Sequence, residues 1–484
     1  MSGLRSAASL ASDGQRAAFL EAARALLGEK GLTRDADAMA PWLTDWRGRY
    51  HGAALALASP ASTQEVAQLV ALCARHGVPI VPQGGNSGMS GGATPDANGE
   101  AILLSLRRMN RVRSLDAGAG QAVCEAGVIL QMLHEEAERH HLRFPLTLGG
   151  KGSATIGGLI ATNAGGTQVL RYGTMRAQVL GIEAVMADGA VLDALTPLKK
   201  DNRGFDLKQL LIGSEGTLGI VTAATLRLLP APAARAVAWL GLDSVITARA
   251  VLRAMDRTLG GALEGFEIVP AHCLASVLAH LPDARPPLSE THEWNALVEC
   301  TGDDPAELSS RFERALASLL EQGLIEDAVI AASEAQAQEL WSLRDAISPA
   351  ERARGPAMQH DISVPVDRMP EFILAAIDAV EAEFPGTTGA AFGHLGDGNV
   401  HFHVLAPPGS APGAWEENEG KKVSARVHDL VTQWGGSISA EHGIGQLKRD
   451  ELARLGDPVA LDLMRRIKAA LDPAGLLNPG KLIP

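Results

Sequence analysis

Residues 145–166 read PLTLGGKGSATIGGLIATNAGG, and this stretch decides the fold class of the chain. Three glycine pairs, at positions 149/150, 157/158 and 165/166, fall within 18 residues and are interleaved with threonine, serine and asparagine. One turn does not need so many glycines. Because glycine lets the backbone approach a ligand closely, the stretch indicates backbone lying along an extended, flat ligand, with hydroxyl and amide groups bonding its polar edge.

Two further glycine-rich segments flank this stretch, PQGGNSGMSGG at 82–92 and LIGSEGTLGIVT at 211–222. Successive backbone N–H groups on glycines can form a concave nest for phosphate oxygens. Residues 82–92 match neither a Walker loop nor a spaced dinucleotide fingerprint. Taken alone they are equally typical of a surface loop, and the other two segments favour a ligand-binding role.

Composition excludes several classes of protein. The chain has 484 residues, enough for two or three domains, and a net charge of −13, which disfavours a nucleic-acid partner. Four cysteines stand singly and far apart, which indicates reduced thiols rather than disulfides. The N-terminus lacks the apolar run of a signal peptide, and no segment offers 18 uninterrupted apolar residues. We expect a soluble cytoplasmic protein, with an organelle matrix as the minority alternative.

The pattern of elements predicts an α+β chain. Ser62 and Glu65 form a capping box for a helix that Gly77 ends. The proline- and alanine-rich residues 228–236 mark a domain boundary. Amphipathic helices alternate beyond it with strand-like runs, which indicates helices packed on an antiparallel sheet. A helical segment forms the end of the chain.

A histidine-rich segment, GHLGDGNVHFH at 393–403, raises the question of a metal site. His401 and His403 lie on one side of an alternating strand, and His394 lies in a glycine turn. These histidines alone are more typical of a bonded loop than of a metal site. Glu441-His442, in SAEHGIG, adds a carboxylate and an imidazole, and with the glycine segments it favours an active site.

Eight motifs in order carry a family resemblance: PQGGNSGMSGG, PLTLGGKGSATIGG, TNAGG, RYG, GSEGTLGI, GHLGDGNVHFH, SAEHGIG and LDPAGLLNPGK. Together they resemble the FAD-dependent D-2-hydroxy acid dehydrogenases of the vanillyl-alcohol oxidase superfamily. That family includes D-2-hydroxyglutarate dehydrogenase, D-lactate dehydrogenase and the glycolate oxidase FAD subunit, and VLDALTPLKKDNRGFDLKQLLIGSEGTLGI is most similar to the first of these.

The resemblance implies a two-lobed FAD-binding domain at 1–230, an α+β substrate and metal domain at 231–425, and a helical segment at 426–484 that returns to the FAD domain. Covalently flavinylated relatives carry a histidine where this chain has Asn86, so we expect non-covalent FAD. The implied cofactor-binding residues are Pro82, Gly84, Gly85, Asn86, Ser87, Gly88, Ser90, Gly91, Thr147, Gly149, Gly152, Ser153, Thr155, Gly157, Gly158, Asn163, Gly165, Gly166, Tyr172, Gly173, Glu215, Gly216, Ile220 and Asn478.

The resemblance also implies the catalytic groups. His394, His401 and Glu441 match the ligands of a divalent metal, with zinc expected first and manganese or iron as competitors. His442 matches the catalytic base. Arg344, Ser348 and Asn399 match residues that bind the substrate, and His403 is left open as a further ligand or a partner of one.

One position departs from the family. Hydroxyglutarate dehydrogenases carry a lysine where this chain has Gln359, in PAMQHDISVP. Glutamine can bond a distal carboxylate of the substrate but brings no charge, and His360 or Arg354 are the candidates to compensate.

We therefore predict FAD- and metal-dependent oxidation of a D-2-hydroxy acid, first D-2-hydroxyglutarate, to the 2-oxo acid. D-lactate and glycolate are the alternative substrates. A metallohydrolase and a non-catalytic flavoprotein subunit are the alternative functions. Electron-transfer flavoprotein or a quinone is the expected electron acceptor, and relatives are commonly homodimers.

Overall fold

The computed structural model describes residues 13–484, so the first 12 residues, on which the organelle alternative partly rests, lie outside it. Contacts between residues divide the chain into two units. Unit 1 comprises described residues 13–165, 174–231 and 441–484, and unit 2 comprises residues 166–173 and 232–440. In the described part of the chain, no helix is long and apolar enough to cross a membrane.

Unit 1 has two lobes, each built on a small sheet. The first sheet has the order β1-β2-β4-β3, in which β2, β4 and β3 run parallel. The second is antiparallel, with the order β5-β6-β10-β8-β9. A separate two-stranded sheet pairs β7 with β11. The strands of unit 1 are β1 (Leu32–Thr33), β2 (Ala56–Ala58), β3 (Ile80–Gln83), β4 (Ile102–Ser105), β5 (Val112–Asp116), β6 (Gln121–Glu125), β7 (Leu142–Arg143), β8 (Val179–Val185), β9 (Val191–Ala194), β10 (Ile220–Arg227) and β11 (Leu229–Pro230).

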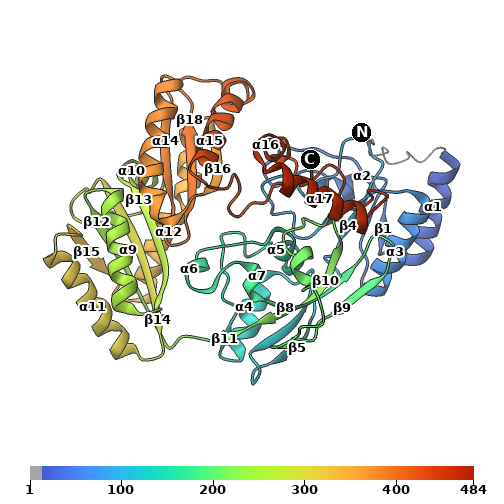
Figure 1. Ribbon diagram of the computed structural model, residues 1–484, viewed down its shortest axis with the longest axis horizontal. Helices are drawn as coiled ribbons and strands as arrows, with labels where there is room; N and C mark the ends of the chain where they lie inside the picture. The colour runs from blue at the N-terminus through green and yellow to red at the C-terminus, as the bar shows by residue number, and fades with distance from the viewer. Residues whose placement is uncertain (1–12) are drawn as a thin grey trace. The chain divides into compact units, whose positions relative to one another are not determined.

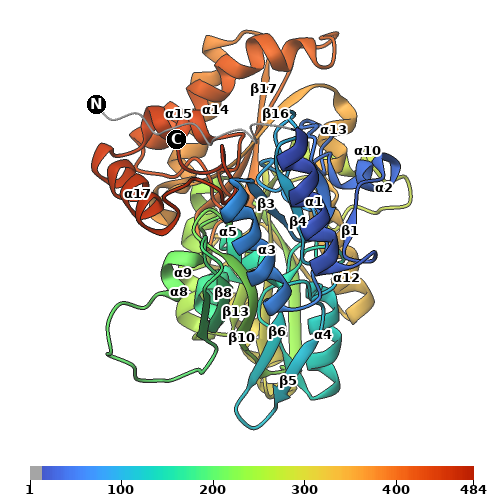
Figure 2. The ribbon, with the colours of Figure 1, turned by 90° about the vertical axis from the view of Figure 1, so that its right-hand side faces the viewer.

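Helices cover both sheets of unit 1. They are α1 (Asp13–Leu27), α2 (Ala36–Met39), α3 (Thr63–His76), α4 (Leu130–Arg139), α5 (Ile156–Thr162), α7 (Met175–Gln178), α8 (Lys208–Leu211), α16 (Arg449–Leu455) and α17 (Pro458–Leu471). Helices α1 and α3 lie side by side against the first sheet (Figure 2). Helix α3 begins and ends as predicted, because the Ser62 hydroxyl accepts a bond from Glu65 N and Gly77 is left-handed.

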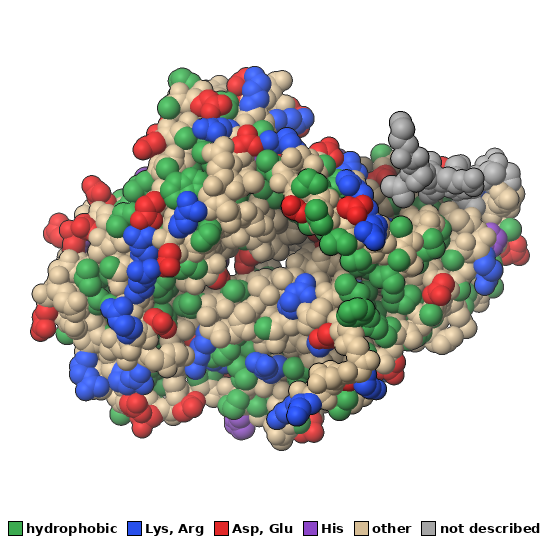
Figure 3. Space-filling view, in the orientation of Figure 1, with side chains coloured by type: hydrophobic (Ala, Val, Ile, Leu, Met, Phe, Trp, Pro, Cys, Tyr) green, Lys and Arg blue, Asp and Glu red, His purple; other side chains and the backbone are tan. Residues whose placement is uncertain are grey.

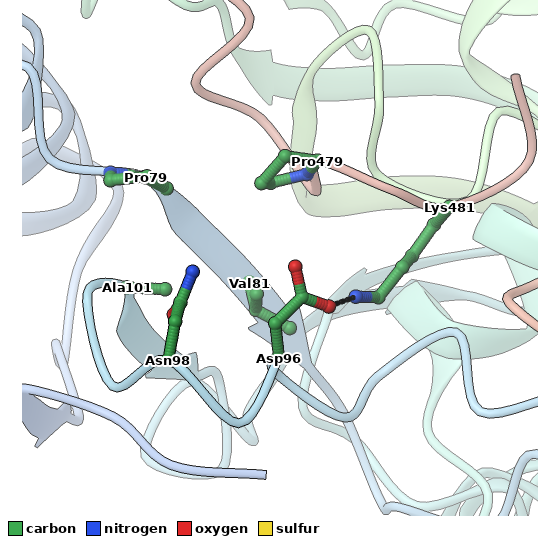
Figure 4. A pocket seen from close by; sticks show the side chains of 7 residues that line it. All are labelled: Pro79, Val81, Asp96, Asn98, Ala101, Pro479 and Lys481. Carbon is green, nitrogen blue, oxygen red and sulfur yellow. Dashed lines mark hydrogen bonds and ion pairs between the residues drawn. The ribbon is translucent and has the colours of Figure 1, made fainter. Parts of the chain in front are cut away.

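The C-terminal residues complete the first sheet of unit 1. Ile80 N donates to Leu476 O, and Asn478 N donates to Ile80 O, both at 2.8 Å. Lys481 is fully buried and its ammonium bonds Asp96 Oδ1 at 2.8 Å, beside a cavity of about 20 Å³ (Figure 4). A space of that size holds about one water molecule, so this place in the fold is a closure of the chain end and not a ligand site.

Unit 2 is built on one seven-stranded sheet of order β15-β12-β14-β13-β17-β18-β16, in which every pair is antiparallel. The strands are β12 (Ala234–Leu242), β13 (Leu263–Pro270), β14 (Trp294–Gly302), β15 (Asp327–Ile330), β16 (Ala357–Ser363), β17 (Thr388–His394) and β18 (Asn399–Leu405). The helices are α6 (Val169–Tyr172), α9 (Val245–Leu259), α10 (Ala271–His280), α11 (Pro305–Glu321), α12 (Glu334–Asp345), α13 (Ile347–Arg354), α14 (Met369–Glu383) and α15 (Lys421–Gln433).

The two faces of this sheet bury different cores. Helices α9, α11, α14 and α15 pack on one face around Phe266, Phe372 and Phe402. Figure 1 shows α9 and α11 next to each other against β12, β13 and β14. Helices α10, α12 and α13 pack on the other face around Trp239 and Phe392. The predicted antiparallel sheet with packed helices is confirmed for this part of the chain.

Surface charge on unit 2 is mixed. On the face drawn in Figure 3, basic and acidic side chains alternate over α9 and its neighbours. Arg249 pairs with Glu371 at 2.7 Å, for example. Such paired charges are unlike the broad basic patch by which proteins hold a nucleic-acid backbone.

Candidate functional site

Strand register places the predicted site residues of unit 2 on one face of its sheet. Residues directly opposite each other in an antiparallel ladder point to the same side. His394 pairs with both Glu267 and Asn399. His401 pairs with Asp361, and its neighbour two residues on, His403, pairs with Gln359. The polar side chains on this face include Gln359, Asp361, His394, Asn399, His401 and His403, together with Glu267.

Glu267 links two of the predicted residues. Its carboxylate accepts a bond from Arg344 Nε at 2.7 Å and another from His394 Nδ1. Burial alone would raise the pKa of Glu267, but the positive charge of Arg344 and the hydrogen bonds from Arg344 and His394 outweigh it and lower this pKa below its ordinary value. The group is therefore an ionised carboxylate beneath the predicted metal ligand and the predicted substrate clamp.

Helix α12 presents Arg344 to the sheet. Ser333 caps the helix start by accepting a bond from Gln336 N, and Trp341 Nε1 donates to Glu299 Oε2 at 2.6 Å. The arginine side chain is 12% exposed. Arg344 and Ser348 lie in separate helices, because α12 ends at Asp345 and α13 begins at Ile347. Ser348 thus lies in the first turn of a new helix.

The side-chain amide nitrogen of Asn399 is hydrogen-bonded, whereas its amide oxygen is not. Its Nδ2 donates to Asp361 Oδ1 and to Ile362 O, both at 3.0 Å. Its Oδ1 is buried and has no hydrogen-bond partner among the described residues. A buried acceptor without a donor costs free energy, so this oxygen fits a ligand that donates a hydrogen bond, such as a hydroxyl group.

The backbone just before Glu441 is bonded to strand β16 of unit 2. Ser437 exchanges two backbone bonds with Ser363, and Ala440 N donates to Asp361 O at 3.3 Å. Glu441 and His442 are the next residues of the chain and begin the last segment of unit 1. The predicted ligand set is His394 and His401 of the sheet face together with Glu441. Two imidazoles and one carboxylate are a donor set that fits a divalent metal.

One of the two suggested substitutes for a charge at Gln359 points away from it. His360 is on the opposite face of β16, where its ring bonds Phe402 O and Ser424 Oγ, each at 2.9 Å. The expectation that His360 compensates is therefore wrong, because alternation along the strand turns it away. Arg354 pairs with Glu351 on α13, and compensation by Arg354 stays a prediction.

In unit 1, two of the predicted glycine segments pack against each other. A Cβ on Gly84 would lie 2.2 Å from Thr155 Oγ1, and one on Gly85 would lie 1.7 Å from Ser153 O. Both glycines are required by this contact between loops. Nothing described lies within 4 Å of a Cβ built on Gly88 or Gly149, so these two positions face open space. The two loops therefore contact each other at Gly84 and Gly85, whereas Gly88 and Gly149 have no neighbour on their Cβ side.

Left-handed backbone gathers at the predicted cofactor positions of unit 1. Asn86, Asn163, Glu215 and Asn478 have φ between 44° and 52°. Such conformations cost free energy for residues other than glycine and cluster at ligand sites. The buried Thr155 Oγ1 and Asn478 Oδ1 also have no hydrogen-bond partner among the described residues. Buried polar atoms without partners, in the same unit as glycines that face open space, fit a polar cofactor such as FAD.

Glu215 holds these loops to the segment that follows His442. Its carboxylate accepts bonds from Ile444 N and Gly445 N at 2.7 and 2.8 Å. Asn478 Nδ2 donates to Glu215 O at 2.7 Å and to Gly92 O at 3.0 Å. Burial raises the pKa of Glu215. Sequence motifs at four distant places are thereby joined into one cluster.

The remaining predicted cofactor residues have varied surroundings. A Cβ on Gly216 would meet the Pro82 ring at 2.5 Å, so these two are in contact. Ile220 packs in the hydrophobic core of the first lobe, which leaves only its backbone for a ligand. Tyr172 belongs to unit 2 together with Gly166 and Gly173, and its hydroxyl donates to the buried Glu264 at 2.7 Å.

Glu267 and Asp361 are site residues that the motifs did not reveal. Both are buried acids within strands, at 0% and 2% exposure. The signal for Glu267 was present, because LEGFEIVP is an apolar strand interrupted by charges, and buried charges are rare unless they are paired. Its partners come from residues 77 and 127 positions later in the chain, which no local pattern shows.

Two family models match the chain. The model described as FAD binding domain matches residues 54–195, and the model described as FAD linked oxidases, C-terminal domain, matches residues 231–482, more than half of the chain. The chain belongs to the FAD-linked oxidase family. It is an FAD-linked oxidoreductase, and the metallohydrolase alternative is set aside.

Individual relatives are similar over most of their length. D-2-hydroxyglutarate dehydrogenase, mitochondrial, of Bos taurus is 39% identical over 450 residues, covering 93% of this chain and 80% of that protein. D-2-hydroxyglutarate dehydrogenase of Xanthomonas citri pv. viticola is 39% identical over 438 residues, covering 90% and 91%. The family predicted from the glycine and histidine motifs is confirmed.

Solved structures share the fold at low identity. p-Cresol methylhydroxylase with substrate bound has a TM-score of 0.75 at 17% identity, covering 97% of both chains. 4-Ethylphenol oxidase from Gulosibacter chungangensis has a TM-score of 0.73 at 20% identity, also covering 97% of both. The predicted vanillyl-alcohol oxidase-type α+β fold is confirmed.

Proposed function

We propose that this chain oxidises a D-2-hydroxy acid to the 2-oxo acid, with D-2-hydroxyglutarate as the first substrate. Unit 1 would hold FAD without a covalent bond, and the sheet face of unit 2 that carries His394 and His401 would supply most of the groups for the substrate and a divalent metal. The observation that carries the proposal is the placement of Arg344 beside His394 on one buried carboxylate. An anion clamp next to a metal ligand suits a substrate whose carboxylate and hydroxyl are on adjacent carbons.

The cofactors supply chemistry that side chains cannot. When bound, FAD supplies a two-electron acceptor for the hydrogen on the substrate's C2. A metal held by His394, His401 and Glu441, zinc first and manganese or iron next, supplies a Lewis acid for the hydroxyl oxygen.

Residues of the chain supply binding and proton transfer. The Arg344 guanidinium binds the carboxylate, a planar task that suits its fork of N–H groups. Asn399 Oδ1 accepts a hydrogen bond from the substrate, and Ser348 and Gln359 complete the binding residues. His442 removes the hydroxyl proton, because imidazole is the side chain whose ordinary pKa lies nearest neutrality. The proton goes to His442, the hydride leaves C2, and the C–O single bond becomes a carbonyl.

A substrate panel tests the proposal. The purified protein is mixed anaerobically with D-2-hydroxyglutarate, D-lactate and glycolate, with and without a chelator. We expect loss of the flavin absorption with D-2-hydroxyglutarate, and a slower loss after chelation. Flavin that no 2-hydroxy acid reduces would reject the proposal and favour the non-catalytic subunit.

The same protein serves to identify the electron acceptor. Reduced flavin formed by the substrate is mixed with an electron-transfer flavoprotein or with a quinone analogue. We expect one of the two to reoxidise it faster than dissolved oxygen does. A faster reaction with oxygen would reject a dehydrogenase and indicate an oxidase.

A further inference from the structure

The strand β13 buries a carboxylate at a place where a strand of this kind normally buries apolar side chains. All eight residues of LEGFEIVP are buried, and Glu267 has no exposed surface. An isolated carboxylate in such a place is strongly unfavourable, so it persists only where it is paired and hydrogen-bonded.

Each oxygen of Glu267 has its own partner. Oε2 accepts from Arg344 Nε at 2.7 Å, and Oε1 accepts from His394 Nδ1. The Arg344 and His394 side chains are themselves mostly buried, at 12% and 8% exposure. One carboxylate thus fixes a side chain from α12 and a side chain from β17.

These bonds decide which nitrogen of His394 carries the proton. Arginine can only donate, and Arg344 Nη2 lies 3.4 Å from His394 Nε2. Nε2 is therefore the nitrogen with the lone pair, and Nδ1 carries the hydrogen that Glu267 accepts. A histidine binds a metal through its unprotonated nitrogen, and a carboxylate on the other nitrogen orients the ring and increases its basicity.

The same carboxylate fixes the plane of the Arg344 guanidinium. A bond at Nε restricts rotation about the last torsions of the side chain. The guanidinium carbon also lies 5.7 Å from the Phe392 ring centroid, which limits movement on that side. A planar group held in this way can meet a carboxylate with two parallel bonds at little cost in conformational entropy.

We propose that Glu267 is the positioning residue that couples metal binding to substrate binding in this site. It orients His394 toward the metal and Arg344 toward the substrate carboxylate. The metal ligand and the substrate clamp therefore keep one fixed geometry relative to each other. This inference rests on the proposed function and adds to it a residue outside the predicted ligand, clamp and base.

Glu267→Gln tests this coupling, because the amide keeps the volume but offers one acceptor oxygen for two donors. The matched control is Glu299→Gln. Glu299 is a half-buried acid on the neighbouring strand β14 that also holds α12, through Trp341, and its other partner is Arg235. Zinc affinity of the metal-free protein is measured by calorimetry, alongside flavin content, melting temperature, KM and kcat with D-2-hydroxyglutarate.

We expect Glu267→Gln to weaken zinc binding about 10- to 100-fold, the usual effect of losing such a partner, and to raise KM by at least about tenfold. Flavin content should match that of Glu299→Gln. Unchanged zinc affinity and KM, or equal losses in Glu299→Gln, would overturn the proposal. If Glu267→Gln does not fold, Glu267→Asp keeps the charge and reaches only one partner, so this variant should either bind zinc more weakly or have a higher KM. Wild-type zinc affinity together with a wild-type KM would contradict the role.

Zinc binding and flavin reduction of the wild-type protein distinguish a failure of this proposal from a failure of the proposed function. A wild-type protein that binds zinc and is reduced by a 2-hydroxy acid supports the function whatever the variants do. A wild-type protein that is reduced but takes up no zinc overturns the ligand set, and with it the role of Glu267.

Discussion

Unit 1 and unit 2 build their candidate sites from different parts of the chain. Unit 1 uses backbone, in glycine loops and left-handed residues, with Gly88 and Gly149 facing open space. Unit 2 uses side chains, gathered on one face of an antiparallel sheet by register. A backbone site is sensitive to an added Cβ, whereas a side-chain site is sensitive to loss of a functional group. The predictions below test this contrast.

The largest effect is expected at His442, the proposed base, because loss of its side chain removes the proton acceptor. Replacing His442 with alanine should slow flavin reduction by the substrate about 10²- to 10⁴-fold, the usual contribution of a positioned general base. FAD and metal content should stay unchanged. Stopped-flow absorbance measures the rate, and His280→Ala, an exposed histidine at the end of α10, is the control. Near-normal reduction in His442→Ala would reject the assignment.

Arg344 tests whether the side-chain site needs geometry as well as charge. Arg344→Lys keeps the charge but loses the Nε bond to Glu267 and the planar fork. Charged hydrogen bonds contribute about 1.5–3 kcal/mol, so KM for the hydroxy acid should rise about 10- to 150-fold. Steady-state kinetics measure it. Arg354→Lys, which alters a partly exposed arginine paired with Glu351, is the control. Equal KM values in the two variants would contradict a clamp at Arg344.

Gly85 and Gly88, in one loop, test how the backbone site of unit 1 responds to an added Cβ. Gly85→Ala places a Cβ 1.7 Å from Ser153 O, so the loops must separate, at a cost of about 1–3 kcal/mol in the free energy of unfolding. Gly88→Ala meets nothing within 4 Å, so the FAD-free protein should keep its stability within about 0.5 kcal/mol and yet bind FAD more weakly.

Denaturant unfolding of the FAD-free protein and flavin fluorescence titration measure the two effects. A Gly88→Ala variant that binds FAD as tightly as the wild type would show that the open side of the loop does not face the cofactor.

The smallest effect is expected at the cysteines, which belong to neither site. Cys73, Cys124, Cys273 and Cys300 are buried and unpaired, which confirms the expected free thiols. Burial raises the pKa of Cys124 to about 12 and raises those of the other three as well. The native protein should therefore react with Ellman's reagent only slowly, and all four thiols should react once it is unfolded in guanidinium. Rapid reaction of a native thiol would show that one of these cores opens.

The sequence predicted most of what is local. The α3 caps, the antiparallel sheet, and the glycine-rich and histidine-rich motifs could be recognised in the sequence. Glycine, capping residues and alternation act over only a few positions of the chain. Glu267, the break of the helix before Ser348, and the departure of His360 from the site face were not evident. Each of them depends on strand register or on a partner far along the chain, and a single sequence contains no direct record of either.

The closure of the first lobe by residues 476–478 has a consequence for how the protein is made. Strand β3 bonds this C-terminal segment through Ile80. From residue 232, where the chain enters unit 2, to residue 478 the ribosome adds 247 residues. At ribosomal speeds of about 5–20 residues per second this takes about 12–50 s. During that interval an open strand edge, a known starting point for aggregation, has no native partner. Nascent chains should need protection by a chaperone until residues 476–478 have been made.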